Sequence, residues 1–275
     1  MIATASLLMI ASGAAHAVVN AVVKSGGDKM SSRALVDGSS ALLVLPLAFV
    51  VPFPVAALPF LVASFAVHTV YLICLIKAFE SADMSAVYPV MRGSAPVIAA
   101  AAAVLWLGDP ITLAAALGTA LVSLGTLAVA WWNRPSLRAL GWALATGVTI
   151  AAYTVIDAKG VRAAPSALSY AVWVFILLGF GIGAMFAAWR GPRFLAEARG
   201  QWKPGLIAGA LSLVTYGLAL WAYRIGDVPR LAALRETSIL FGIAIAFFFL
   251  KERINPGRAL GAVLIAAGAG VLLML

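Results

Sequence analysis

Long apolar stretches constrain the fold of this chain more than any other feature. When the sequence is broken at charged, Pro and Gly clusters, ten stretches of about 19 residues or more remain, and each can cross a hydrocarbon layer of roughly 30 Å as a helix. The connections between them are too short for a soluble domain. The chain is therefore predicted to be an all-α integral membrane protein with ten transmembrane helices. The expected spans are residues 2–24, 33–51, 57–79, 84–107, 112–132, 138–158, 168–189, 203–224, 229–250 and 256–275.

The composition excludes a water-soluble domain and several kinds of site. Hydrophobic residues make up 64% and charged residues 11% of the chain, against about half and about a quarter in soluble domains. The net charge of +9 is typical of a membrane protein whose loops lie beside anionic lipid. The sequence has no run of basic residues that could bind along a nucleic-acid backbone. One Cys and two His allow neither an intrachain disulfide nor an ordinary zinc site. We predict no metal, cofactor or nucleic-acid partner.

The distribution of Lys and Arg predicts the orientation in the membrane. Thirteen of these residues belong to connections that follow odd-numbered spans, and four belong to the other side. Because basic residues favour the cytoplasmic side, the odd-numbered connections are predicted to be cytoplasmic and both termini to lie outside.

The two halves of the chain repeat each other. Residues 116–125 read ALGTALVSLG and residues 259–268 read ALGAVLIAAG, and the same offset of 143 residues carries Arg92 onto Arg235. Each half has an odd number of spans, so the halves must enter the membrane in opposite directions. We predict two inverted five-helix repeats, residues 1–133 and 134–275, within one membrane domain. Glycines seven residues apart in both sequences predict that the fifth and tenth spans pack together, away from any cavity.

Two motifs carry a resemblance to a known family. WLGDPIT at residues 106–112 and LKERIN at residues 250–255 each precede a glycine-spaced helix, and the first span ends at Lys24. This ordered pattern resembles the drug/metabolite transporter superfamily, specifically its ten-span EamA-type carriers, over the whole chain. The resemblance implies a secondary transporter in the plasma membrane, the inner membrane in a bacterium, with a central cavity between the halves. His16 stands where small multidrug resistance relatives have a membrane-embedded Glu.

Arg92 and Arg235 are the only basic residues that fall well inside spans. An arginine near a helix centre costs about 2.5–3.5 kcal/mol on insertion, so it persists where it faces water, a partner or a ligand. Both are expected roughly 6 Å from the midplane, on opposite sides, each facing one half of a common cavity. We predict that both bind substrate. The alternative is a structural arginine that caps the carbonyls of a kinked helix, which Pro89 and Pro96 favour for Arg92.

Glu236 has no acidic counterpart in the first half, where Gly93 stands at the same offset. It either neutralises a nearby arginine or binds a substrate ammonium group or a proton. Adjacent side chains on a helix diverge by about 100°, so Arg235 is a poor partner for it. We include Glu236 among the predicted substrate-binding residues.

A polar stripe on the first span is also expected to face the cavity. His16 and Asn20 lie one helical turn apart, and Lys24 follows by another turn. Tyr153 and Asp157 take the positions of His16 and Asn20 in the second repeat. Because Asp157 and Lys24 lie near the expected helix ends, we interpret these two as interfacial anchors.

His68 and several deep aromatic residues complete the candidate site. His68 lies at the centre of the third span, where a helix–helix hydrogen bond is the alternative to a role in proton coupling. Aromatic rings stack on planar substrates or hold an ammonium group by cation–π attraction, and ordinary packing is the alternative for each. The candidate rings are Tyr71, Tyr88, Tyr153, Trp173 and Tyr216.

These residues favour a transporter of a small polar metabolite. Two cations with one or two buried acids predict an anionic or zwitterionic substrate, moved by alternating access through a cavity between the first, third, fourth, sixth, eighth and ninth spans. The alternatives are a proton-coupled exporter of cationic or aromatic drug-like compounds and, from another class, a non-transporting accessory subunit. No nucleophile–base or metal motif indicates an enzyme. The expected partners are the substrate, the lipid bilayer and a coupling proton, and a monomer is expected, with a dimer as the alternative.

Overall fold

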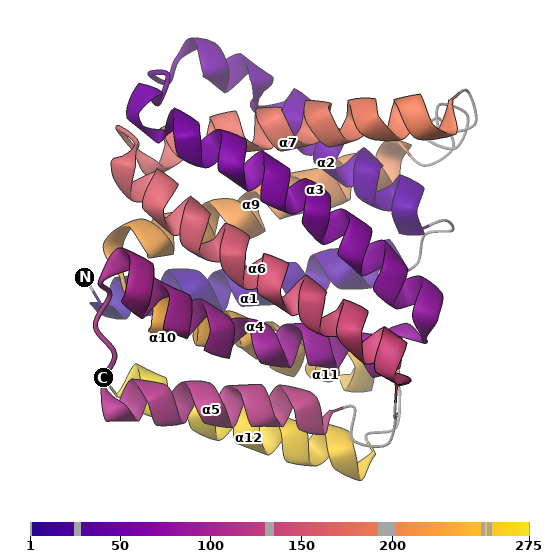
Figure 1. The fold of residues 1–275 in the computed structure, drawn as a ribbon, viewed down its shortest axis with the longest axis vertical. Coiled ribbons are helices and arrows are strands. Elements are labelled where there is room, and N and C mark those ends of the chain that lie inside the picture. Colours follow the sequence, from indigo (N-terminus) through magenta and orange to yellow (C-terminus); the bar gives the residue numbers. More distant parts are fainter. Residues whose placement is uncertain are drawn as a thin grey trace.

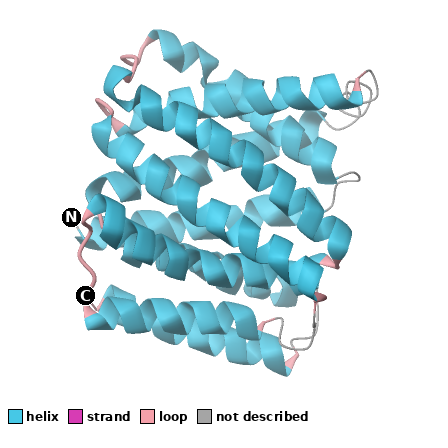
Figure 2. Cartoon of the chain, in the orientation of Figure 1, coloured by secondary structure: helices cyan, strands magenta, loops and turns pink. Residues whose placement is uncertain are grey.

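The described part of the chain is helical throughout. The computed structural model describes residues 2–24, 29–129, 135–191, 202–248, 251 and 255–274. Every regular element within these ranges is an α-helix or a short 3-10 helix (Figure 2). The prediction of an all-α fold is confirmed. The elements are α1 (Ile2–Lys24), α2 (Lys29–Val44), η1 (Leu45–Phe49), η2 (Val55–Ala57), α3 (Leu58–Ser81), α4 (Met84–Leu107), α5 (Leu113–Ala128), α6 (Leu137–Ala163), α7 (Ala167–Arg190), α9 (Trp202–Ile225), α10 (Val228–Leu234), η3 (Arg235–Thr237), α11 (Ser238–Phe248) and α12 (Pro256–Leu273).

Side-chain caps fix where four of these helices begin. The side-chain oxygens of Thr112, Ser136, Ser166 and Asn255 each accept a hydrogen bond from the backbone N–H three residues further on. Such caps satisfy backbone donors that a helix start leaves without a partner. The polar residue at the end of each connection therefore sets the first turn of α5, α6, α7 and α12.

Eight helical segments within the described ranges are long and apolar enough to cross a membrane. Two further apolar segments, Leu35–Phe49 and Leu113–Ala128, are shorter, and they lie at the positions of the second and fifth expected spans. Both termini lie at the same edge of the bundle (Figure 1), as an even number of crossings requires. The ten-span arrangement and the inversion of the two halves stay predictions.

The expected ninth span, residues 229–250, is present as an apolar helical segment over Val228–Phe248, and a short 3-10 helix interrupts it. α10 ends at Leu234, the 3-10 helix η3 follows, and α11 continues from Ser238. The hydroxyl of Thr237 donates to the carbonyl oxygen of Leu234 at 2.7 Å. A side chain that bonds to the backbone in this way competes with regular helix hydrogen bonding. The break lies at the residues that carry the candidate charges.

The helices α5 and α12 form a close pair at one end of the bundle (Figure 1). A Cβ atom on Gly268 would lie 2.7 Å from the carbonyl oxygen of Gly118, and one on Gly125 would lie 2.8 Å from the carbonyl oxygen of Gly261. Only a residue without a side chain allows the backbones to approach this closely. The predicted packing of the fifth span against the tenth is confirmed.

Helices α1 and α4 flank the broken segment α10–η3–α11. α6 packs against both α3 and α4, and α1 packs against α9 and α11. A Cβ atom on Gly13 of α1 would lie 3.1 Å from Oγ1 of Thr237, so the absence of a side chain there lets α1 come close to η3. α4 lies beside α10. The broken helix is thus enclosed by α1 and α4, and its charged residues are buried.

Candidate functional site

Arg92, Arg235 and Glu236 come together where α4 faces η3. Arg92 lies in α4, and the other two residues open η3. Their exposed fractions are 6%, 8% and 3%. Charged residues are almost never buried to this degree without a partner, so the contacts of each one decide what the site can do.

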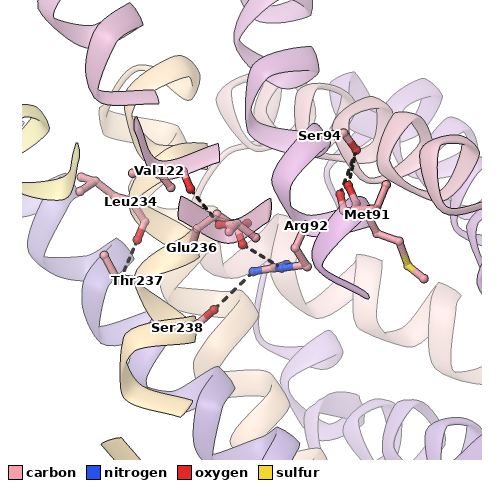
Figure 3. A network of polar contacts seen from close by, with 10 residues as sticks. Met91, Arg92, Ser94, Val122, Leu234, Glu236, Thr237 and Ser238 are labelled. Carbon is pink, nitrogen blue, oxygen red and sulfur yellow. Dashed lines mark hydrogen bonds and ion pairs between the residues drawn. The ribbon is translucent and has the colours of Figure 1, made fainter. Parts of the chain in front are cut away.

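Arg92 and Glu236 form a buried ion pair (Figure 3). Nε of Arg92 donates to Oε2 of Glu236 at 3.0 Å, and Nη2 donates to Oγ of Ser238 at 3.4 Å. Of the two roles expected for Glu236, neutralisation of an arginine is therefore present in the structure, with the partner coming from the other half of the chain. The pair cancels the charge of Arg92.

Arg235 has a different environment. Its guanidinium carbon lies 5.4 Å from the ring centroid of Tyr216, within the range of a cation–π contact. Its Nε is buried and has no hydrogen-bond partner among the described residues. A buried donor without an acceptor costs about 1–3 kcal/mol, and more when the group is charged. Nε of Arg235 is therefore a charged donor of the site that lacks an acceptor among the described residues.

One narrow pocket joins these residues. Apolar residues of α4, α6 and α10 line it together with the polar residues Arg92, Thr154, Tyr223, Arg235 and Glu236. The pocket has room for about one water molecule. A metabolite does not fit in the pocket in this conformation. α1 and α3, which were expected to contribute to the cavity, supply no described residue to the lining.

His68, Tyr71 and Tyr153 form an aromatic cluster between α3 and α6, outside the pocket lining. The rings of His68 and Tyr153 stack with centroids 4.2 Å apart and an interplanar angle of 23°. Tyr71 meets Tyr153 edge-on at 5.7 Å. Nδ1 of His68 lies 2.9 Å from the carbonyl oxygen of Ser64 in its own helix. The structure thus gives these residues a role in helix packing, and their contact with substrate stays a prediction.

The other candidate residues lie further from the pocket. Tyr88 is half-buried on α4, one turn before Arg92, and His16 is half-buried on α1. Trp173 meets Phe53 edge-on, with centroids 4.7 Å apart. None of these three side chains lines the pocket described above. The side chain of Asn20, and with it most of the expected polar stripe, lies outside the described part of the structure.

Asp157 is fully buried, so its interpretation as an interfacial anchor is wrong. The hydroxyl of Tyr170 donates to its Oδ1 at 2.7 Å, and the hydroxyl of Tyr216 donates to its Oδ2. The expected span ended at residue 158, whereas α6 continues to Ala163. The additional turn moves Asp157 away from the helix end and into the bundle.

Comparison with known proteins identifies the family. The model of the EamA-like transporter family matches residues 137–274, which is half of the chain. The chain belongs to the EamA-like transporter family. The resemblance drawn from the sequence motifs is thereby confirmed, and the protein is a multi-pass membrane transporter of the drug/metabolite type.

Comparison with solved structures shows that another protein has the same fold as this EamA-like transporter. A solved crystal structure of a protein matches it with a TM-score of 0.78 at 16% sequence identity, covering 99% of this chain and 98% of that one. At this identity the match shows the fold alone. No curated protein matches the chain.

Two pocket residues of the EamA-like transporter were not identified from the sequence. Tyr223 lies seven residues after Tyr216 on α9, and two helical turns place both on the same face. That spacing is a signal that sequence reasoning could have used. Thr154 follows Tyr153 in α6 and lines the pocket, but threonines are common in membrane helices and its position carries no comparable signal.

A second ion pair in the EamA-like transporter involves Asp109 of the WLGDPIT motif. Nη1 and Nη2 of Arg162 donate to Oδ1 and Oδ2 of Asp109 at 2.7 and 3.0 Å. Arg162 also donates to the carbonyl oxygens of Tyr223 at 3.0 Å and Gly226 at 2.9 Å. The backbone N–H of Val228 donates to Oδ2 of Asp109 at 2.8 Å. This network ties together α6, α9, α10 and the connection after α4.

Proposed function

We propose that this transporter moves a small polar metabolite with a carboxylate group, either anionic or zwitterionic, and that Arg235 binds the carboxylate. The observation that carries the proposal is the buried Nε of Arg235, which lies at the pocket and has no acceptor among the described residues. A guanidinium presents several N–H donors in a planar fork that matches a carboxylate. An anionic ligand would supply the missing acceptor.

The charges of the pocket support an anion over a cation. Arg92 and Glu236 neutralise each other, so the charge of Arg235 decides the sign of the pocket lining. A cation would be repelled by Arg235 and would have to compete with Arg92 for Glu236. An amino group of a zwitterion, in contrast, would approach Glu236 while its carboxylate occupied Arg235. Anionic and zwitterionic substrates are therefore both compatible with this lining.

Alternating access supplies the opening that the narrow pocket lacks. The network around Asp109 and Arg162 closes the bundle on the side of the even-numbered connections. In the proposed cycle this network separates when that side opens, and the two halves of the chain rock against each other. By the positive-inside distribution of Lys and Arg, the closed side faces away from the cytoplasm.

The test is flux through proteoliposomes that contain the purified protein alone. The probes are gluconate and glutamate as monoanions, alanine as a zwitterion and tetraethylammonium as a cation. We expect the anions or the zwitterion to be transported, and Arg235→Gln to lower their apparent affinity by about 10- to 100-fold, because a hydrogen bond to a charged group is worth about 1.5–3 kcal/mol. Arg138→Gln removes an exposed arginine of α6 and is the matched control.

Two results would contradict the proposal. Preferred transport of the cation, undiminished in Arg92→Ala and Arg235→Ala, would favour an exporter of cationic compounds. Absence of flux for every probe with the purified protein would favour a non-transporting accessory subunit.

A further inference from the structure

A second buried acid lies beside the pocket, and the proposed function leaves it without a role. Asp157 of α6 has no exposed surface. Both of its carboxylate oxygens accept hydrogen bonds from phenol groups, Oδ1 from Tyr170 and Oδ2 from Tyr216. Among the described residues no cation forms an ion pair with it. A carboxylate enclosed by neutral donors is unusual in a protein interior, where buried charges are normally paired.

Tyr216 connects Asp157 to the proposed anion site. Its hydroxyl donates to Asp157, and its ring lies under the guanidinium of Arg235. Asp157 and Arg235 therefore contact the same tyrosine side chain, Asp157 at its hydroxyl and Arg235 over its ring. Any change of charge at Arg235 acts on Asp157 across a single ring in a poorly screened interior.

The charges of this region sum to zero before a ligand arrives. Arg92 and Arg235 contribute two positive charges, and Glu236 and Asp157 contribute two negative charges when ionised. A monoanion bound at Arg235 would leave one net negative charge in the buried cluster. A net charge in a medium of low dielectric constant is costly. One proton taken up with the anion restores neutrality.

We propose that Asp157 is the proton-binding site of this transporter and takes up one proton for each monoanion that binds at Arg235. This inference rests on the proposed function. The proton comes from the aqueous phase and forms an O–H bond at Oδ2. That O–H then donates to the phenol oxygen of Tyr216, and the O–H of Tyr216 no longer donates to Asp157. No other bond is made or broken.

The structure favours Oδ2 over Oδ1 for this step. Tyr216, at Oδ2, is half-buried, whereas Tyr170, at Oδ1, is fully buried. Tyr170 also packs on Gly160, one turn after Asp157, where any side chain would collide with its ring. The bond from Tyr170 is therefore held in place by packing. Tyr216 is the partner that can turn.

Other titratable and charged groups surround Asp157 at greater distance. On α6 itself, Tyr153 precedes Asp157 by one turn and stacks on His68, and the exposed Lys159 lies over the ring of Phe60. Arg162 is paired with Asp109. The elements packed against α6 further contribute Tyr71, Tyr88, Arg92, Tyr223, Arg224 and Arg230, of which Arg224 donates to the carbonyl oxygens of Val161 and Ala164. Arg235 and Glu236 of η3 line the pocket together with Thr154 of α6. Tyr216 contacts both Arg235 and the carboxylate of Asp157. Among the surrounding groups, Arg235 is the one whose charge is neutralised when an anion binds.

The experiment is calorimetric binding of gluconate and of glutamate to the purified full-length protein, in buffers of different ionisation enthalpy and over a range of pH. The difference between buffers gives the number of protons taken up per anion. We expect one proton per anion in the wild type, and an affinity that rises about tenfold per unit decrease in pH where uptake occurs.

Asp157→Asn is the decisive variant because its neutral amide resembles the protonated acid. We expect it to bind both anions with the low-pH affinity of the wild type, with no proton uptake and no dependence on pH. Asp83→Asn, at an exposed position before α4, is the matched control and should behave like the wild type. Tyr216→Phe keeps the ring under Arg235 but removes one donor to Asp157. It should change the pH range of proton uptake, because one of the two phenol donors to the carboxylate is lost.

The outcomes separate this inference from the proposed function. If both anions bind to the wild type without proton uptake, Asp157 is not a proton site, while Arg235 can still be the anion site. Equal proton uptake in the wild type and in Asp157→Asn, or an unchanged pH range in Tyr216→Phe, also overturns the inference. If neither anion binds to the wild type, the assignment of Arg235 fails and the inference fails with it.

Discussion

Two arginines of this transporter, Arg162 and Arg235, hold their charge inside the protein in different ways. Arg162 donates from Nε, Nη1 and Nη2, and its acceptors are both oxygens of Asp109 and two backbone carbonyls. Arg235 lies against the ring of Tyr216, and its Nε has no acceptor among the described residues. The first guanidinium is fully engaged within the protein, and the second is not.

The difference separates a structural role from a binding role. Removal of one partner from a satisfied pair leaves an uncompensated buried charge, which lowers the free energy of unfolding. Removal of a guanidinium that lacks an acceptor takes away an existing cost, but it also takes away a site for an anion. Variants of the Arg162 network should therefore lower stability more than anion binding. Variants of Arg235 should lower anion binding more than stability.

Asp109→Ala should have the largest effect on stability. It leaves Arg162 without its carboxylate and Val228 without an acceptor, and we expect the free energy of unfolding to fall by about 3 kcal/mol. Thermal unfolding in detergent measures this change. Asp83→Ala, at an exposed acid, should stay within about 0.5 kcal/mol of the wild type. A variant at Asp109 as stable as the wild type would contradict the structural role of the network.

Arg235→Gln should show the reverse pattern. Its unfolding free energy should stay within about 1 kcal/mol of the wild type, because an incompletely satisfied charge is removed and a proton taken up at Asp157 keeps the buried cluster neutral. Its affinity for gluconate or glutamate should fall by about 10- to 100-fold. Arg235→Lys, which keeps the charge but loses the planar fork, should recover part of the affinity. A large loss of stability with unchanged affinity would place Arg235 in the same class as Arg162.

Glu236→Gln tests whether Arg92 resembles Arg162. The variant leaves Arg92 without its ion-pair partner, and we expect a loss of about 2 kcal/mol in unfolding free energy. The double variant Arg92→Gln/Glu236→Gln should be more stable than Glu236→Gln alone. A double-mutant cycle measures this coupling. Additive effects of the two changes would mean that the pair is not formed in the membrane protein.

Gly125→Ala measures how much a packing change far from both arginines alters the free energy of unfolding. Its Cβ atom would lie 2.8 Å from a backbone carbonyl oxygen of α12, and overpacking of this kind costs about 1–3 kcal/mol. Gly141→Ala on α6 meets nothing within 4 Å, so it should be neutral or stabilising by up to about 1 kcal/mol. Anion affinity should be unchanged in both variants. A shift in affinity for Gly125→Ala would show that the α5–α12 pair is coupled to the pocket.

Much of the fold could be predicted because its signals are local. Apolar length marks the helices, and the glycine spacing at Gly118 and Gly125 predicts the α5–α12 contact. The starts of α5 at Leu113 and α12 at Pro256 follow the offset of 143 that relates the two halves. The candidate charges Arg92 and Arg235 could also be identified, because the cost of an arginine inside a membrane span is a property of the residue itself.

The partners of these residues could not be predicted in the same way. The Arg92–Glu236 pair joins residues 144 positions apart, and no local pattern specifies that contact. Asp157 was misplaced because a helix end estimated from the sequence shifts the depth of every residue near it. The break at η3 coincides with a hydrogen bond from the hydroxyl of Thr237 to the carbonyl oxygen of Leu234, and no local sequence pattern specifies that bond.

The central claim is that Arg235 receives the carboxylate of the substrate. A crystal structure of the protein with a brominated carboxylate such as bromobenzoate tests it most directly, because the bromine can be located by its anomalous scattering. The account predicts a bromine peak in a widened pocket between α4, α6, α9 and η3, with the carboxylate hydrogen-bonded to Nε of Arg235. An occupied site elsewhere in the bundle, with Arg235 still lacking an acceptor, would contradict it.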